Sequence, residues 1–219
     1  MSGLRVEGVS RRFGEFQAVA PVSFAVEPGA CLVLSGENGS GKSTLLGMAA
    51  GRLQPSTGEV LLNGELLREQ DARHRRLLSV ALGAPSFYPD LSVRDHLDLI
   101  AVSHGLGRDA GERVLESLAR FGVDDLADRM PSSLSSGQTQ AVLLAAALVR
   151  PFEVLILDEP EQRLDDGARQ RLGGILREVV EDGAAVLLAS HDTRLAETVA
   201  DQVLVLADGE VVEHRGPGA

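Results

Sequence analysis

One short segment, Gly36-Glu37-Asn38-Gly39-Ser40-Gly41-Lys42-Ser43-Thr44, constrains this chain more than any other feature. It fits the pattern G-x-x-x-x-G-K-[ST], in which glycines let consecutive backbone N–H groups converge on phosphate oxygens. The apolar run Cys31–Leu34 precedes the segment, and Thr44–Ala50 predicts a helix after it. A buried strand, a glycine-rich loop and a helix N-terminus in this order predict a phosphate site in an α/β core.

The cation in this loop is unusual for the chain. Lys42 is a single lysine in a total of 21 lysine and arginine residues. A compact ammonium group suits the β- and γ-phosphates of a nucleotide better than a broad guanidinium does. We therefore assign Lys42 to those phosphates and the hydroxyl of Ser43 to Mg²⁺. The alternative, a glycine-rich turn that binds nothing, leaves the solitary lysine without a reason.

A second acidic segment follows a strand. Val154–Leu157 is an apolar run that ends in Asp158 and Glu159. In a parallel sheet the carboxyl ends of the strands meet at the ligand crevice. Asp158 could hold Mg²⁺, directly or through water, and Glu159 could polarise a water that attacks a γ-phosphate. An acidic pair after a strand is often only the start of a solvated loop, so the assignment depends on the phosphate loop.

The segment Leu134-Ser135-Ser136-Gly137-Gln138 lies about twenty residues before Asp158. Serine is common as the N-cap of a helix, so the segment predicts the start of a helix over about Gly137–Val149. The same geometry is a second possible anion site, because a helix N-terminus presents free N–H groups and a positive dipole end.

Composition limits what the chain can bind. The formal net charge is −11, so we expect no basic face that follows nucleic acid and no polybasic patch for anionic lipid. A single cysteine, Cys31, excludes a disulfide framework and favours a reducing compartment. The longest apolar run, Ala141–Val149, falls short of the ~20 residues that cross a bilayer, and no signal peptide is expected at the N-terminus.

Strands and helices alternate along the chain, which predicts an α/β fold with a largely parallel sheet. Short strands are expected near the N-terminus, and a hairpin turned at Asp208-Gly209 closes the chain before a frayed tail from His214. The expected division is a core over about residues 1–84 and 151–212 and a helical lobe over about 85–150. Within that lobe, Ser92-Val93-Arg94-Asp95 predicts a capping box and a helix through about Ser103.

Together these segments resemble the ATP-binding subunit of an ABC transporter, over about residues 4–212. The matching segments are Gly36–Thr44 (Walker A), Leu134–Gln138 (signature), Val154–Glu159 (Walker B with the catalytic glutamate), Leu164-Asp165 (end of the D-loop), His191 (switch histidine) and Phe13 (adenine-stacking aromatic). The resemblance implies a P-loop NTPase core with an N-terminal antiparallel β subdomain and a small helical lobe.

The resemblance also implies the partners and cofactors. Two like or unlike subunits would pack head to tail around ATP and Mg²⁺, with each signature facing the partner's phosphate loop. A separate transmembrane permease would hold the chain at the inner face of the cell membrane, and no nucleic acid partner is implied. The predicted function is ATP hydrolysis that powers transport, with a preference for export because no regulatory domain follows Val212.

Several positions depart from the family's pattern. Gly83 stands where the family has a glutamine, Ser136 replaces a glycine of the signature, and Ala141 and Ala146 stand where arginines are common. The D-loop reads Glu161-Gln162-Arg163-Leu164-Asp165, which is more charged than usual. Two alternatives therefore stay open: a weakly active or non-catalytic half of an unequal ABC pair, and a soluble ABC ATPase that has no role in transport.

Overall fold

The computed structural model of the chain describes residues 3–68, 70–83 and 86–216. Its contacts form two compact units: unit 1 comprises the described residues of 1–82, 152–159 and 176–219, and unit 2 those of 83–151 and 160–175. The division expected from the sequence, with a lobe over about 85–150, stays a prediction, and Pro85 lies outside the described residues. The contacts join residues 160–175 to the helical unit.

The larger sheet of unit 1 has six strands in the order β10-β9-β3-β8-β7-β6. They are β3 (Cys31–Ser35), β6 (Leu78–Ala81), β7 (Val154–Asp158), β8 (Ala185–Ala189), β9 (Gln202–Ala207) and β10 (Glu210–Arg215). All neighbours from β9 to β6 are parallel, and β10 pairs antiparallel with β9. The prediction of a mostly parallel α/β core is confirmed.

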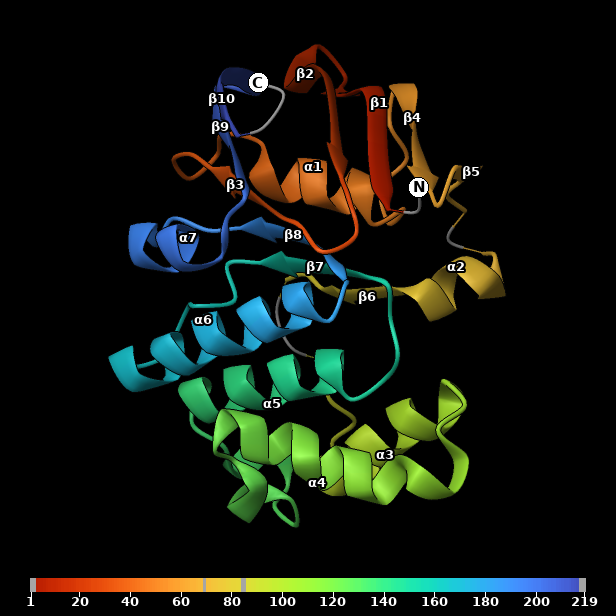
Figure 1. Cartoon of the computed structure of the whole chain (residues 1–219), viewed down its shortest axis with the longest axis vertical. Coiled ribbons are helices and arrows are strands. Elements are labelled where there is room, and N and C mark those ends of the chain that lie inside the picture. Colours follow the sequence, from red (N-terminus) through yellow and green to blue (C-terminus); the bar gives the residue numbers. More distant parts are fainter. Residues whose placement is uncertain (1–2, 69, 84–85, 217–219) are drawn as a thin grey trace. The chain divides into compact units, whose positions relative to one another are not determined.

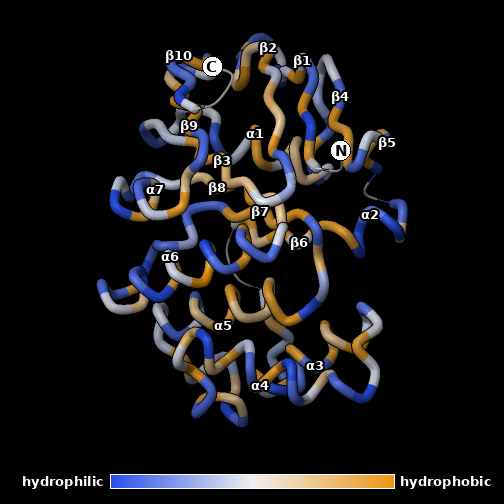
Figure 2. Tube along the Cα trace, in the orientation of Figure 1, coloured by the Kyte–Doolittle hydropathy of each residue, from blue (hydrophilic) through white to orange (hydrophobic). Residues whose placement is uncertain are grey.

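The central strands of this sheet are fully buried. Residues 31–34, 154–157 and 185–189 are at most 2 % exposed, and Figure 2 colours β6 and β7 as hydrophobic. Cys31 begins β3, and its N–H donates to the Asp201 carboxylate at 2.8 Å. Strands buried on both faces are expected where helices or a second layer cover a parallel sheet.

The second sheet of unit 1 is antiparallel, in the order β2-β1-β4-β5. Its strands are β1 (Leu4–Phe13), β2 (Phe16–Val26), β4 (Thr57–Leu62) and β5 (Glu65–Leu66). Strands β1 and β2 are longer than the sequence predicts, because the polar part of β1 still pairs. Ser10, for example, is 3 % exposed and its hydroxyl lies 2.7 Å from that of Thr57.

Helix α1 (Lys42–Ala49) lies between the two sheets of unit 1 (Figure 1). Leu45, Leu46 and Met48 are at most 1 % exposed and belong to the core with residues from both sheets. This packing fixes the axis of α1 and therefore the position of the loop that precedes it. Two other helices of this unit, α2 (Ala72–Leu77) and α7 (Thr193–Val199), are short, and the sequence did not predict α2.

Unit 2 is helical, with α3 (Val93–Ser103), α4 (Ala110–Phe121) and α5 (Ser136–Leu148). Helix α6 (Asp166–Glu181) begins in this unit and ends in unit 1. The predicted capping box is confirmed, because the Ser92 hydroxyl accepts from the Asp95 N–H and the Asp95 carboxylate accepts from the Ser92 N–H. Leu97, Val114, Leu118 and Val142 are fully buried and form the core of this unit.

One expectation near the C-terminus is wrong. His214 and Arg215 are not a frayed tail but part of β10, where they pair with Leu204 and Val203. One side-chain contact crosses between the two strands, because His214 Nε2 lies 3.2 Å from Gln202 Oε1. Within β10, the Arg215 guanidinium donates to both oxygens of Glu213. The rest of the predicted tail, residues 217–219, lies outside the described residues.

Candidate functional site

The predicted phosphate loop follows β3 and leads into α1. Three of its glycines have positive φ, at 145° for Gly36, 103° for Gly41 and 85° for Gly39. A side chain at Gly36 would strike the Leu206 carbonyl, and one at Gly41 would lie 2.7 Å from the Ala18 carbonyl. These positions require glycine for both conformation and space, which explains the spacing that the sequence shows.

Lys42 begins α1 and folds back over its own loop. Its ammonium group donates to the carbonyl oxygens of Gly36 at 2.7 Å and Glu37 at 2.9 Å. The side chain is 4 % exposed, so the cation is almost fully desolvated, and Glu159 Oε1 lies 4.0 Å from it. Asn38 and Ser43 are exposed, whereas Ser40 is buried. The loop is therefore closed around this ammonium group.

A distant hairpin supports this loop through a contact that no local motif predicts. The Gly209 N–H, in the turn between β9 and β10, donates to the Ser40 carbonyl at 3.1 Å. The Gly209 carbonyl accepts from the Ala20 N–H of β2 at 2.7 Å, and a side chain at Gly209 would lie 2.7 Å from the Ala18 carbonyl. The Asp208-Gly209 turn was predicted. Its packing against the phosphate loop was not, because Ser40 and Gly209 are about 170 residues apart in the chain.

Asp158 ends β7 at the edge of the sheet where the phosphate loop begins. Burial raises the pKa of its carboxyl, and the Glu159 charge adds to this, against a hydrogen bond from Ser43 and the charge of Lys42. One of its oxygens, Oδ1, is buried without a hydrogen-bond partner among the described residues. A buried carboxylate oxygen beside a serine hydroxyl fits a hard divalent cation such as Mg²⁺.

Glu159 brings the predicted catalytic residues together. Its Oε1 lies 4.0 Å from Lys42 Nζ and 3.8 Å from His191 Nδ1, and its side chain is 17 % exposed. Glu159 has φ of 45°, a left-handed conformation that is uncommon for a residue with a side chain, and its N–H donates to the Ala189 carbonyl of β8 at 2.9 Å. Such strain is typical of functional positions.

His191 follows β8 on the segment before α7. Its side chain is 58 % exposed, so much of it can be reached from solvent. The chain around it is ordered by Ser190, whose Oγ accepts from the Asp192 N–H at 3.0 Å, and by Asp192, which caps α7 through Oδ1. The resemblance predicted His191 as a site residue, and the structure shows that hydrogen bonds of Ser190 and Asp192 hold the backbone on either side of it.

Phe13 lies at the end of β1 and is 48 % exposed. The guanidinium carbon of Arg11 lies 4.6 Å from the centre of its ring, a cation–π contact that covers one face. A stacked adenine would need the other face. Phe16, which pairs with Phe13 across the hairpin, is 67 % exposed and offers a second aromatic surface that sequence reasoning missed.

The predicted signature segment lies in unit 2 at the start of α5. Ser135 is the N-cap: its hydroxyl accepts from the Gln138 N–H at 3.3 Å, and Gln138 Oε1 accepts from the Ser135 N–H at 2.9 Å. Ser135 and Ser136 are exposed, and Leu134 and Gly137 are half-buried. The helix N-terminus that the sequence predicted is present and reachable by a ligand.

The predicted D-loop follows directly after the acidic pair. Leu164 is 5 % exposed, and Asp165 Oδ1 accepts from the Ala168 N–H at 2.8 Å at the start of α6. Gly83 has φ of 75°, and a side chain built there meets nothing within 4 Å. The position that usually holds a glutamine therefore leaves space for a Cβ atom among the described residues, although its backbone conformation suits glycine.

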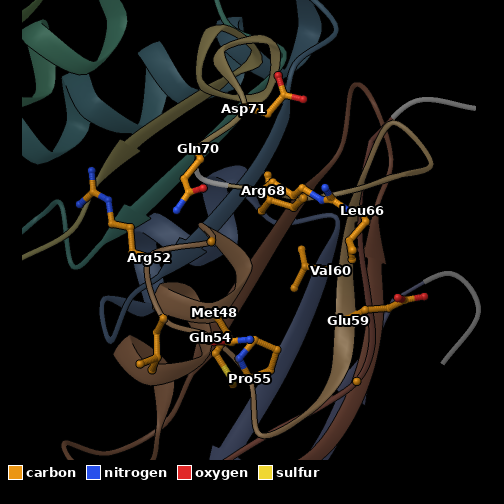
Figure 3. A pocket seen from close by; sticks show the side chains of 14 residues that line it. Met48, Arg52, Gln54, Pro55, Glu59, Val60, Leu66, Arg68, Gln70 and Asp71 are labelled. Atoms are coloured by element: carbon orange, nitrogen blue, oxygen red, sulfur yellow. The ribbon is translucent and has the colours of Figure 1, made fainter.

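A hollow of about 870 Å³ opens in unit 1 at the other end of α1 (Figure 3). Its apolar lining includes Met48, Val60 and Leu67, and Arg52 and Arg68 contribute cations. None of the predicted site residues lines it. Because α1 has eight residues, and hence a length of ~12 Å, this hollow and the phosphate loop are separate places on the core.

Comparison with known proteins decides the family. The family model described as ABC transporter matches residues 19–162, which include both the phosphate loop and the acidic pair. The chain belongs to the ABC transporter family. It resembles the "Fe(3+) ions import ATP-binding protein FbpC 1" of Rhizobium meliloti (strain 1021), with 34% identity over 95% of this chain and 60% of the relative. The chain thus spans about three fifths of the length of the iron-import relatives.

A shorter relative is matched almost end to end. The chain is 36% identical to the "Thiamine import ATP-binding protein ThiQ" of Jannaschia sp. (strain CCS1), over 95% of this chain and 91% of that protein. Among solved structures, one described as the ATP-binding subunit of an ABC transporter superimposes with a TM-score of 0.90 at 29% identity, over 99% of this chain and 90% of the other. The resemblance inferred from the motifs is confirmed.

The fold is also shared with more distant structures. A cassette described as dimeric, in a post-hydrolysis state and bound to ADP and Pi, gives a TM-score of 0.89 at 24% identity, over 99% of both chains. At this identity the likeness shows the fold alone. It confirms the predicted architecture of an antiparallel β subdomain, a mostly parallel sheet and a helical lobe.

Proposed function

We propose that the chain binds and hydrolyses ATP. The observation that carries the proposal is the convergence of Lys42, Glu159 and His191, which come from three separate segments, on the edge of the phosphate loop. Glu159 accepts a proton from the attacking water, and Lys42 neutralises charge on the terminal phosphates. His191 lies on the open side of Glu159, where it orients the γ-phosphate. The loop N–H groups of Gly36–Thr44 hold the remaining phosphate oxygens.

The residues that would hold Mg²⁺ are Ser43 and Asp158. The proposal is supported by the effect of the Ser43 hydroxyl, which lowers the pKa of Asp158, and by the unpartnered Oδ1 of Asp158. When bound, the cation neutralises phosphate charge and fixes the phosphate geometry. Phe13, on its face away from Arg11, would stack on adenine.

ATP binding requires Lys42 to change partners. Its ammonium group leaves the carbonyl oxygens of Gly36 and Glu37 for the phosphates, and the loop keeps its shape through its glycines and through Gly209. Because the ammonium is already desolvated, little further desolvation is needed when the phosphates arrive. Most of the Coulomb attraction is therefore available for binding.

The second half of the ATP site would come from another subunit. One phosphate loop covers only one side of a triphosphate, and the exposed N-terminus of α5 at Ser135–Gly137 is suited to the other side. We infer a head-to-tail dimer in which Leu134–Gln138 of one subunit faces ATP on the other and the D-loop residues Leu164 and Asp165 line the contact. Hydrolysis of the γ-phosphate then weakens the closed pair.

We infer that the dimer powers a membrane permease and that the direction is import. The relatives named above are import proteins for Fe³⁺ and thiamine, so the earlier preference for export lacks support. The thiamine relative is matched over 91% of its length, so a short chain does not distinguish export from import. No helix among the described residues is long and apolar enough to cross a membrane. A permease would supply the span and hold the chain at the inner face.

Turnover of the purified chain tests hydrolysis. We expect phosphate release that requires Mg²⁺ and is abolished by Glu159→Gln, while ATP still binds. Activity that survives this substitution would overturn the assignment of the base. Import is tested by co-expressing the chain with any multi-span protein that is encoded beside it. In membranes that contain both proteins, we expect a solute-binding protein to stimulate ATP turnover.

A non-catalytic role in an unequal pair is the second candidate. Gly83 and Ser136 favour it, since neither can supply the family's usual contact at its position. It predicts ATP binding without phosphate release by the chain alone, together with turnover when a second, different cassette is added.

A further inference from the structure

We propose that Gln140 is a positioning residue that ties the loop after β7 to α5, so that the D-loop and the signature move as one body. The proposal rests on the proposed function, because both segments would face a partner subunit's ATP. It concerns a residue outside the motifs described above, and the contacts that carry it all lie inside unit 2.

The first contact is a buried hydrogen bond. Gln140 lies in the second turn of α5 and is 7 % exposed. Its Nε2 donates to the Pro160 carbonyl at 3.1 Å. An amide among the apolar residues of this helix costs free energy unless it is bonded, so an apolar side chain would suit the position better if packing alone mattered. The bond holds the first residue after Glu159.

The second contact is a close approach of backbone. A side chain at Gly137 would lie 2.8 Å from the Arg163 carbonyl. Gly137 has no positive φ, so glycine is required here for space and not for conformation. The loop is thus packed against α5 at Arg163 as well as at Pro160.

The loop between these contacts has little freedom. Arg163 has φ of 65°, and the Leu164 N–H donates to the Glu161 carbonyl at 3.3 Å. Glu161 and Leu164 are both buried, at 2 % and 5 % exposed. Two ties to one helix and two buried side chains make residues 160–164 follow any displacement of α5.

The boundary between the two units falls next to Glu159, the proposed catalytic base. Glu159 belongs to unit 1 and Pro160, the next residue, to unit 2. A displacement of α5 therefore reaches the peptide after Glu159 through Gln140 and Pro160. When Gln140 is lost, the signature and the D-loop can no longer reach a partner in register, although each remains intact.

The test compares Gln140→Leu with Ser117→Ala in a Glu159→Gln background that does not turn over. Ser117 is a matched control, because its buried hydroxyl also donates to a carbonyl of α5, that of Ala145, at 2.7 Å and away from the loop. Sedimentation with Mg²⁺ and ATP measures dimerisation, and nucleotide titration at low protein concentration measures binding to the monomer. Hydrogen exchange measures the Leu164 amide without nucleotide.

For Gln140→Leu we expect roughly tenfold weaker dimerisation, unchanged binding of ATP to the monomer and faster exchange at Leu164. For Ser117→Ala we expect lower thermal stability and none of these effects. Equal changes in both variants, or no change in Gln140→Leu, would overturn the proposal. If the Glu159→Gln chain itself fails to dimerise with ATP, the proposed function is wrong. Exchange at the Leu164 amide then still tests whether Gln140 holds the loop. Gln140→Asn, which keeps a shorter amide, replaces any leucine variant that does not fold.

Discussion

The phosphate loop and the start of α5 are both glycine-containing segments at a helix N-terminus, but different contacts hold them in place. The phosphate loop is shaped by its own backbone, with positive φ at Gly36, Gly39 and Gly41 and with Lys42 bonded to two of its carbonyls. The start of α5 has ordinary helical geometry and is held by a capping box and by residues 160–163. The first is shaped by its own backbone, and the second is proposed to form one wall of a site on a partner subunit.

This difference explains how glycine is used in the two places. Gly41 needs its residue type for φ of 103° and for the nearby Ala18 carbonyl, whereas Gly137 needs it only for the Arg163 carbonyl. Substitutions in the phosphate loop should therefore damage ATP binding by the isolated chain. Substitutions at the start of α5 should damage only what requires a second subunit.

The largest effect is expected for Lys42→Ala. It removes the desolvated ammonium that is proposed to bind the phosphates and the two bonds that close the loop. We expect turnover to fall by more than about 100-fold, together with loss of ATP binding by calorimetry. Lys42→Arg keeps the charge and is the matched control. We expect it to restore little of the turnover or of the ATP binding. Full binding by Lys42→Ala would contradict the self-contained nature of this site.

Glu159→Gln should separate chemistry from binding. The amide keeps the volume and removes the base, so we expect turnover to fall by about 100-fold or more while ATP affinity is retained or increased. The substitution also removes a negative charge 4.0 Å from Lys42, which favours binding of an anionic ligand. Single-turnover assays and nucleotide titration measure the two effects, and parallel loss of both would contradict the division of roles.

Ser135→Ala tests the other wall. It removes the cap of α5, at a cost of about 1 kcal/mol in stability, and one hydroxyl from the exposed N-terminus. We expect ATP binding by the monomer to be unchanged and ATP-dependent dimerisation to weaken by roughly tenfold. Ser92→Ala, at the matching cap of α3, is the control for stability. If Ser92→Ala weakened dimerisation as much as Ser135→Ala, the effect would be one of folding alone.

Asp158→Asn should stabilise the free chain and abolish Mg²⁺-dependent turnover. Burial raises the pKa of Asp158 above its ordinary value of 3.8. Ionisation is therefore less favourable in the folded state, so the cost is present at neutral pH and is lost as pH falls below that ordinary value. Because the group is partly solvated, the gain is less than about 1 kcal/mol. Thermal unfolding at pH 7 and at pH 3 should show the gain only at pH 7.

The smallest effect is expected for Gly83→Gln. A Cβ atom at this position would meet no described residue within 4 Å, but φ of 75° is unfavourable for a residue with a side chain. We expect a loss of about 1 kcal/mol in stability and a change in turnover of less than about threefold. A large gain in turnover would show that the missing glutamine limits hydrolysis by this chain. Gly83→Ala reports the backbone cost alone.

Much of the fold follows from local sequence. The phosphate loop, the Ser92 and Ser135 caps and the central apolar strands are recognisable because a few adjacent residues determine each of them. The full length of β1 and the pairing of His214 were missed, since the residues concerned are polar and are ordered by partner strands.

The site follows the same rule. The convergence of Lys42, Glu159 and His191 agrees with the motifs, but their distances depend on the order of the strands in the sheet. The Gly209 contact to Ser40, the Arg11 cover on Phe13 and the Gln140 bond to Pro160 could not be predicted. Each joins segments, or sets a side-chain orientation, that no short motif encodes.

The position of Cys31 has a practical consequence. Its thiol is 0% exposed at the start of the central strand β3, and burial, aided by the Asp201 charge, raises its pKa to about 12 against a smaller opposing effect of Arg177. No other sulfhydryl occurs in the chain. An alkylating reagent can therefore modify only molecules in which the middle of the sheet has come apart. The modification rate, followed by mass spectrometry, measures how often that happens and how far nucleotide slows it.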